Sequence, residues 1–380
     1  MNENELMSSL PVPKAVAKMA IPSVISSLVT VVYNMADTFF VGQTGDPLQV
    51  AAVSLTNPIF ILFMAFANMF GMGGSAAASM AMGEKNEKRM KQVSAFVTYA
   101  SLIVGVALAV ILMVFMTPVL NMFGANEQTF LYAKGYTFHI AYGAPFIIWS
   151  AAVSFVVRAE GASKEAMIGI LSGVCVTGLP TAVFSMLMSV STIVLNQILV
   201  AYGNAPVAAI GIVFKANMFI TFLQMGLANG VQPLLGYNYG SGDHKRFVSV
   251  ERYTKKCCVI VGILATALFF ILREPIIRLF ISDGEVVYYG VKMLIAYMLS
   301  GPVIGLLFVN MNCMQSVGNS FPATILSVMR QGLLLIPLLY LLNACMGLNG
   351  VIYGQALTDY AAVILSAVLW RRIRRRIERR

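Results

Sequence analysis

Residues 31–42 read VVYNMADTFFVG, and they close an apolar run that begins near residue 15. A helix needs roughly 20 apolar residues to cross the hydrocarbon core of a bilayer, so this run is long enough to span one. It contains one acid, Asp37, and an ionised carboxylate is costly in such surroundings unless it is paired or changes its protonation. The stretch therefore predicts a transmembrane helix with an ionisable residue that serves a function.

The rest of the chain repeats this apolar pattern. Of its 380 residues, 58% are hydrophobic and 11% are charged, whereas a soluble domain has roughly 25% charged residues. We therefore expect an all-α polytopic membrane protein, and a soluble fold is excluded. Ten spans are predicted, at about 15–42, 49–78, 93–119, 131–157, 177–202, 206–236, 255–272, 288–314, 321–343 and 350–370. The polar start MNENELMSSL lacks the features of a signal peptide, so the first span is expected to direct insertion.

The basic residues fall on one side of the predicted spans. With the N-terminus inside, twenty Lys and Arg lie on the inner side and four on the outer side. The positive-inside rule then predicts a multi-pass protein of the plasma or inner membrane with both termini in the cytoplasm. The tail at 373–380 is expected to face anionic lipid. Because the net charge of +10 is sorted by side, we expect a lipid bilayer and no nucleic acid as the partner.

The chain contains an internal repeat. When it is shifted by 157 residues, Gly73 falls on Gly230 and Gly83 falls on Gly240, and further identities follow in the same order over more than 140 residues. Four spans separate the matched positions, so the two copies have the same orientation in the membrane. This pattern predicts two helical lobes related by an axis along the membrane normal.

The two copies differ in length. An N-terminal lobe at 1–170 has four predicted helices, and a C-terminal lobe at 171–372 has six, followed by the basic tail. About two helices are missing from the first copy, near LSGVCVTG at 171–178. Loss of an even number of helices keeps the orientation of everything that follows, in agreement with the distribution of charge.

Four stretches resemble one transporter family. They are YNMADTFFVGQTG at 33–45, GMGGSAAASMAMGEKN at 71–86, SVSTIVLNQILVAYGNAPVAAIGI at 189–212 and VNMNCMQSVGNSFPATILSVMRQGLLLIPLLYLLN at 309–343. Together they resemble the multidrug and toxic compound extrusion (MATE) transporters, in the bacterial multidrug-efflux branch. The resemblance implies twelve helices in two six-helix lobes and exchange of organic cations for protons or sodium. It also implies that the fifth and sixth helices are the missing pair.

Asp37 is the leading candidate for ion coupling. Tyr33 and Asn34 lie four and three residues before it, so the three side chains share a helix face. A carboxylate beside an amide and a phenol suits reversible binding of a proton or a cation. The resemblance implies the same role for Asp37, with further ligands from the fifth and sixth helices, so their loss would remove partners from the site. A hydrogen-bonded acid near the outer interface is the alternative.

Three further ionisable residues lie inside predicted spans. Lys215 suits a structural or gating role better than cation binding, because like charges repel, although a part in coupling stays open. Arg330 and Asp359 lie near the middles of the last two spans, at similar depth. They predict a structural ion pair in the second lobe, and a proton-linked opening of the pair is the alternative.

Candidate cleft residues are weaker. Asn310 and Gln197, with Asn196 beside it, are amides that could face a central cleft, but amides in spans more often join helices. Trp149 is an aromatic residue that would suit a flat organic cation. Most other aromatic residues and methionines are expected to face lipid or fill the core.

The sequence argues against an enzyme. His139 and His244 are the only histidines, the five cysteines show no metal or disulfide spacing, and no nucleophile–base pair stands out. No metal and no cofactor are expected apart from a coupling proton or sodium ion. The predicted function is secondary efflux of small organic cations by a monomer through alternating access. A non-transporting remnant and a lipid-linked oligosaccharide flippase are the alternatives.

Overall fold

The computed structural model describes residues 7–42, 47–123, 127–156, 187–188, 190–281 and 283–377, and within these ranges it is helical without a strand. The all-α expectation is confirmed. The elements of the first part are α2 (Val12–Gly42), α3 (Pro47–Gly83), α4 (Glu87–Val114), α5 (Met116–Met122) and α6 (Glu127–Val156). Those of the second part are α8 (Asn204–Gly240), α9 (His244–Ile271), α10 (Arg273–Arg278), α11 (Gly284–Met298), α12 (Gly301–Ser316), α13 (Phe321–Val328), η1 (Met329–Leu334), α14 (Leu335–Met346) and α15 (Leu348–Ile377).

Eight of the ten predicted spans correspond to helices that are long and apolar enough to cross a membrane. Seven are single candidates, and the eighth is the pair α11 and α12, which is bent by 47°. The span at 131–157 corresponds to α6, a continuous helix of 30 residues that is not among these candidates. The span at 177–202 lies largely outside the described residues, which show a short helix at Val190–Val200.

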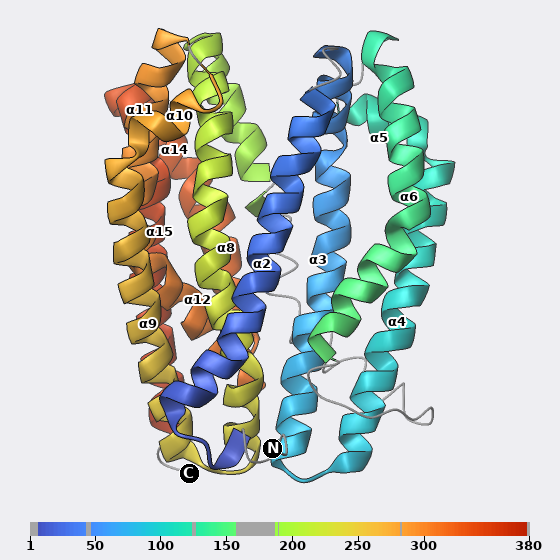
Figure 1. Cartoon of the computed structure of the whole chain (residues 1–380), viewed down its shortest axis with the longest axis vertical. Coiled ribbons are helices and arrows are strands. Elements are labelled where there is room, and N and C mark those ends of the chain that lie inside the picture. The colour runs from blue at the N-terminus through green and yellow to red at the C-terminus, as the bar shows by residue number, and fades with distance from the viewer. Residues whose placement is uncertain are drawn as a thin grey trace.

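The long helices run side by side in two groups (Figure 1). In the first group α3, α4 and α6 pack on one another. In the second group α8 packs on α9, α11 and α12, and α15 packs on α12 and α14. The helix α2 runs between the groups and packs mainly on α8, with few contacts to α3. The division into lobes at residue 170 stays a prediction, and α2 bridges the two sides of it.

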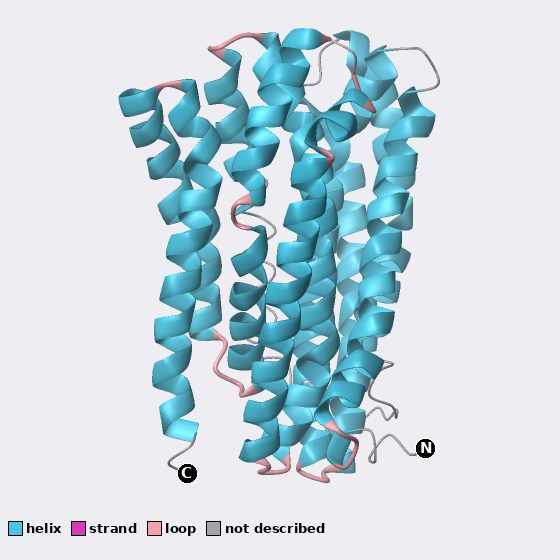
Figure 2. Ribbon diagram, turned by 60° about the vertical axis from the view of Figure 1, so that its left-hand side comes forward, coloured by secondary structure: helices cyan, strands magenta, loops and turns pink. Residues whose placement is uncertain are grey.

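The start of α2 and the end of α15 lie at the same end of the bundle, which we name the terminal end (Figure 2). There Met7 is buried in a cluster of apolar side chains from α8, α9, α12 and α15. Arg246 at the start of α9 holds this segment, because its side chain donates to the backbone carbonyls of Met7 and Leu10 at 3.0 and 2.6 Å.

The two groups of helices approach most closely at the terminal end, where α3 meets α8. A Cβ on Gly240 would overlap with the backbone carbonyl of Met80, and a Cβ on Gly83 would overlap with that of Tyr237. Gly83 and Gly240 are the same position in the two copies of the repeat, so each helix presents its repeat glycine to the backbone of the other. Small residues at such crossings let helices pack closely within a membrane.

Candidate binding and coupling site

A pocket lies between α3, α8 and α12, which the fold brings together from both helix groups. Its lining is rich in thioethers and amides, has one aromatic ring and carries no charged side chain. The lining residues are Met72, Met225, Asn229, Phe308, Met311, Asn312 and Gln315. Met72 and Asn229 each precede the closing glycine of their helix by eleven residues, roughly 16 Å along a helix axis. The pocket therefore lies above the contact between Gly83 and Gly240.

Helix geometry explains why α12 supplies most of the lining. Phe308, Met311, Asn312 and Gln315 are spaced at i, i+3, i+4 and i+7, so they occupy one face of the helix. That face is directed toward α8 and α3. Methionine adapts its shape to irregular partners, and an aromatic ring offers a flat face, so these residue types suit flat organic molecules. The space that they enclose here is about 20 Å³, which is roughly the room for one water molecule, so a larger ligand requires the two helix groups to separate.

Amide side chains join α8 to α12 at the pocket. The Nδ2 atom of Asn312 donates to Oδ1 of Asn229 at 3.0 Å, and Nε2 of Gln232 donates to Oε1 of Gln315 at 3.0 Å. The Ser316 hydroxyl adds a third bond, to the backbone carbonyl of Gln232. These bonds fix the amide side chains of α8 against those of α12.

Arg330 and Asp359 form a buried ion pair inside the second group of helices. The Nε atom of Arg330 lies 2.7 Å from Oδ1 of Asp359, and the side chains are 6% and 3% exposed. Gln355, one turn earlier on α15, donates to the same carboxylate oxygen at 3.0 Å. Burial of two charges is offset when they are paired at this distance and hydrogen-bonded.

Arg330 lies on η1, a π-helical segment within the path from α13 to α14. Such segments widen the helix by one residue per turn and are frequent at functional sites. A residue from another part of the chain contacts this segment, because the Ser191 hydroxyl donates to the backbone carbonyl of Gln331. Sequence patterns gave no sign of this distortion, since MRQGLL is compatible with an ordinary helix.

Phe308 connects the ion pair to the pocket. It lines the pocket, and the guanidinium carbon of Arg330 lies over its ring, 5.8 Å from the centroid. A cation over an aromatic face is attracted by the electron density of the ring. The positive charge of Arg330 is thus separated from the pocket by a single side chain.

The structure brings some of the predicted residues together and separates others. Arg330 and Asp359 meet, while Lys215 on α8 is half-buried and forms no ion pair with the described residues. Tyr33, Asn34 and Asp37 belong to α2, but their side chains lie outside the described part of the chain.

None of the predicted cleft residues lines the pocket. Asn310 is buried and donates to the Ser366 hydroxyl of α15 at 2.9 Å, because it lies off the helix face that carries Phe308 and Gln315. Gln197 is exposed, Asn196 is half-buried, and Trp149 on α6 is 37% exposed. The amides of α12 that line the pocket are Asn312 and Gln315.

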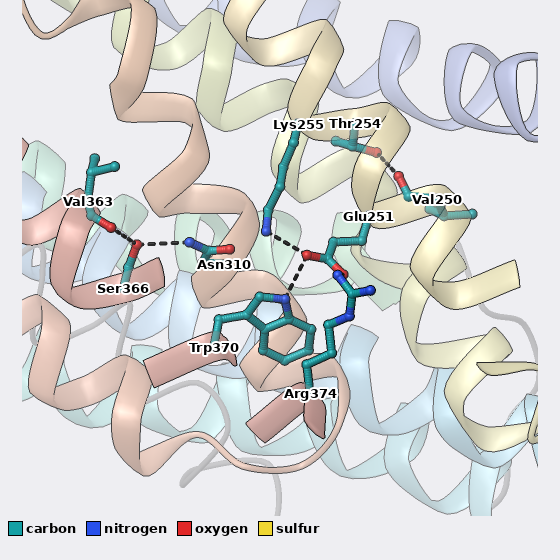
Figure 3. Close-up of polar contacts among 9 residues, drawn as sticks. All are labelled: Val250, Glu251, Thr254, Lys255, Asn310, Val363, Ser366, Trp370 and Arg374. Carbon is teal, nitrogen blue, oxygen red and sulfur yellow. Dashed lines mark hydrogen bonds and ion pairs between the residues drawn. The ribbon is translucent and has the colours of Figure 1, made fainter. Parts of the chain in front are cut away.

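Glu251 is a buried acid that the sequence did not single out (Figure 3). Its Oε1 atom accepts from Lys255 at 2.5 Å and from the indole nitrogen of Trp370 at 2.7 Å, and Arg374 lies 3.6 Å from Oε2. These contacts of Glu251 join α9 to the last turns of α15 at the terminal end. The spacing of Glu251 and Lys255 by four residues on a helix was a usable signal, since such a pair can form an ion pair on one helix face.

The described residues hold no group of three or more His, Cys, Asp or Glu side chains placed to bind a metal ion. A multi-pass helical bundle with an uncharged pocket between two helix groups is an arrangement that suits a membrane transporter.

Comparison with known proteins identifies the family. The MatE family model matches residues 22–184 and again residues 180–341, so the chain belongs to the MatE family. The two matches are consecutive copies of one unit, which confirms the internal repeat.

Curated relatives match over nearly the whole chain. The multidrug export protein MepA of Staphylococcus haemolyticus is 27% identical over 428 aligned positions, covering 96% of this chain and 94% of the relative. The protein of the same name from Staphylococcus aureus (strain NCTC 8325 / PS 47) is 25% identical, covering 94% and 93%. Because 428 aligned positions exceed the 380 residues of the chain by 48, the first relative has at least 48 residues with no counterpart here. Two helices with their loops would account for a difference of this size.

Solved structures share the fold. An outward-facing multidrug resistance MATE family transporter of the MOP superfamily superposes with a TM-score of 0.93 at 18% identity, over 99% of both chains. A MOP superfamily transporter from Pyrococcus furiosus, described as having a binding pocket of reversed polarity, gives a TM-score of 0.91 at 18% identity over 100% and 99%. At this identity the likeness concerns the fold.

Proposed function

We propose that this chain is a secondary active transporter that exports organic cations, by antiport against protons or sodium. The pocket between the helix groups carries the proposal, because its thioethers, amides and single ring suit flat and chemically varied molecules. Membership of the MatE family and similarity to proteins named multidrug export proteins support it. No enzymatic activity, no metal and no cofactor are expected.

The orientation follows from charge. Exposed basic residues gather at the terminal end, among them Lys85, Lys88, Arg252 and Arg371, and the positive-inside rule places such an end in the cytoplasm. The close contact at Gly83 and Gly240 would then close the cytoplasmic side. On this orientation the structure corresponds to an outward-facing state of a monomer in the plasma or inner membrane.

Asp37 on α2 is proposed as the ion-coupling residue. It is an acid inside a span, and Asn34 and Tyr33 share its helix face. A proton or a cation taken up there would release the organic cation outward.

Two alternative functions have less support. The residues missing relative to the MepA proteins favour a remnant that folds but does not transport. A flippase for lipid-linked oligosaccharides is less well supported, because a pyrophosphate headgroup calls for several cationic side chains. The pocket lining has none, and Arg330 is paired with Asp359.

Filling the pocket tests the proposal. Met225→Trp places a large ring in it, and Met346→Trp is the matched control, because Met346 is 59% exposed on the outside of α14. Gradient-driven ethidium transport in proteoliposomes should fall at least tenfold for the first variant and stay within twofold of the wild-type rate for the control. Equal rates for all three proteins would remove the pocket from the transport path. No transport by any of them would favour the remnant.

A further inference from the structure

We propose that the break between α11 and α12 is the hinge at which the pocket opens, and that hydrogen-bond donors on three neighbouring helices position α12 there. The break lies at Leu299 and Ser300, where the two helices meet at an angle of 47°. Four of the seven residues that line the pocket belong to α12, so a change in its tilt moves most of the lining. The inference rests on the function proposed above and adds the place where the motion occurs.

Pro302 frees backbone carbonyls at the break. In a continuous helix the N–H of residue 302 would donate to the carbonyl of Met298, and proline has no N–H. The N–H of Val303 would likewise donate to Leu299, but it donates to Ser300 at 3.0 Å instead. Two carbonyls therefore lack their helical partners within a membrane span, where an unsatisfied carbonyl is costly.

Side chains of two other helices bond to these carbonyls. The hydroxyl of Thr266 on α9 donates to the Met298 carbonyl at 3.3 Å, and the hydroxyl of Tyr360 on α15 donates to the Leu299 carbonyl at 2.9 Å. Breaks in membrane helices are tolerated when neighbouring side chains satisfy the freed backbone groups in this way. The bundle thus contains partners for a helix that is broken at this point.

Glycines make room for the donors at the start of α12. The Nε2 atom of Gln224 on α8 donates to the carbonyl of Gly301. A Cβ on Gly301 would overlap with the Thr266 hydroxyl, and a Cβ on Gly305 would overlap with the amide oxygen of Gln224. The start of α12 is therefore held through its backbone, and the rest of the helix can tilt about this point.

The first copy of the repeat has the proline but not the break. A shift of 157 residues places Pro145 on Pro302, and α6 passes Pro145 as a continuous helix. The positions of the first copy that match the donors on α8 and α9 are Ala67 and Ala109, which carry no polar side chain. The proline alone does not break the helix, so the break belongs to the copy that has the donors.

A small tilt at the break is enough to change the pocket. Gln315 lies fourteen residues after Gly301, roughly 21 Å along the helix, so a tilt of about 10° would move it by roughly 4 Å. The pocket encloses about 20 Å³, so it must widen before it admits an organic cation. Because α12 has few contacts with α3, a tilt away from α3 separates the two helix groups at the pocket.

The test compares ethidium binding with stability, for the full chain in lipid nanodiscs. Tyr360→Phe removes the donor to the Leu299 carbonyl. The N–H of Val303 is then the available partner, which favours a continuous helix. Pro302→Ala introduces an N–H for the Met298 carbonyl and favours the same state, so the double variant should contain an unbroken helix.

Each substitution has a matched control. Tyr353 lies on α15 like Tyr360, is equally exposed at 43%, and donates no hydrogen bond to the described residues, so Tyr353→Phe controls for loss of a hydroxyl. Pro322 lies at the start of α13 but follows a loop, so Pro322→Ala controls for loss of a proline where no helix is broken. Both controls should keep ethidium affinity within twofold of the wild type.

Tyr360→Phe is expected to weaken ethidium binding about fivefold and to lower the melting temperature, because a carbonyl within the span loses its donor. Adding Pro302→Ala should restore the melting temperature but weaken ethidium binding further, to at least tenfold. A structural role alone would instead restore affinity together with stability.

Ethidium affinity within twofold of the wild type in the double variant would overturn the hinge, because the pocket would then open without the break. A double variant less stable than Tyr360→Phe would also overturn it, since the unbroken helix must satisfy its own carbonyls. If the wild type binds no ethidium, the proposed function fails and the inference fails with it.

Discussion

At the scale of single residues, Asp359 has surroundings that the structure describes, whereas those of Asp37 are predicted from the sequence. Asp359 is paired with Arg330 and bonded to Gln355, so its charge is balanced within the second helix group. Asp37 was predicted to share its helix face with Asn34 and Tyr33, an amide and a phenol that carry no positive charge. An acid whose predicted neighbours are uncharged can change its protonation more readily than one paired with a cation, so Asp37 is proposed as the better candidate for ion exchange.

Asp37→Asn should abolish coupling while leaving the fold intact, because asparagine has nearly the same shape but does not titrate near neutral pH. We expect ethidium efflux driven by a pH gradient to fall at least tenfold in proteoliposomes. Glu274→Gln, at an exposed acid on α10, should keep the wild-type rate. Unchanged efflux in Asp37→Asn would exclude Asp37 from coupling.

Asp359→Asn should also lower stability, because it removes the carboxylate that lies 2.7 Å from the buried guanidinium of Arg330. Breaking one side of a buried pair costs about 3–5 kcal/mol, whereas an exposed pair is worth about 1 kcal/mol or less. The melting temperature in detergent should therefore drop clearly for Asp359→Asn and hardly for Glu274→Gln. Replacing both buried charges, as Arg330→Met with Asp359→Leu, should restore most of the loss. A failure to do so would mean that further contacts of Arg330 dominate.

At the scale of helices, the structure depends on the ends of α15 and on the crossing of α3 with α8. Glu251 accepts hydrogen bonds from Lys255 of its own helix and from Trp370 of α15. The bond from Trp370 joins α15 to α9 at the terminal end. The repeat glycines allow α3 and α8 to touch there. Both contacts belong to the end that we assign to the cytoplasm.

Trp370→Phe keeps the ring and removes the donor to Glu251. Hydrogen bonds to charged groups are worth about 1.5–3 kcal/mol, so the melting temperature should fall and proteolysis at the end of α15 should become faster. Trp149→Phe, at a half-exposed indole of α6, should change neither quantity. Equal effects of the two substitutions would argue against an anchor at Glu251.

Gly240→Ala should disturb the contact between the helix groups, because its methyl group has no space beside the carbonyl of Met80. The measurement is maleimide labelling of a cysteine introduced at Ser79, which is fully buried at this contact. We expect labelling several times faster in the Gly240→Ala background. Gly211→Ala is the control, since a Cβ on Gly211 meets nothing within 4 Å. Equal labelling rates would mean that the contact does not depend on this glycine.

At the scale of the whole molecule, the sequence predicted the helical class, eight of the described spans and the repeat. These depend on properties that are local to the chain: long apolar runs, sorted charges and matching glycines such as Gly83 and Gly240. The meeting of Arg330 and Asp359 also follows from two charges at similar depth in neighbouring antiparallel helices.

The pocket was harder to predict, because it depends on which face of each helix meets the other group. Asn310 and Asn312 are two residues apart on α12, yet one bonds to α15 and the other lines the pocket. No periodicity in this very apolar helix distinguishes the two faces. Glu251 was missed for a related reason, because its partner Trp370 lies 119 residues later in the chain and nothing local to Glu251 predicts their contact.

The central claim is that a chain of this length, with a shortened first copy of the repeat, still exports organic cations. The most direct measurement is ethidium export from preloaded proteoliposomes that contain the purified 380-residue protein, under an imposed proton or sodium gradient. We predict export that requires one of the two gradients and stops when an ionophore collapses it. Export equal to that of protein-free liposomes under both gradients, from protein shown to be folded, would contradict the account.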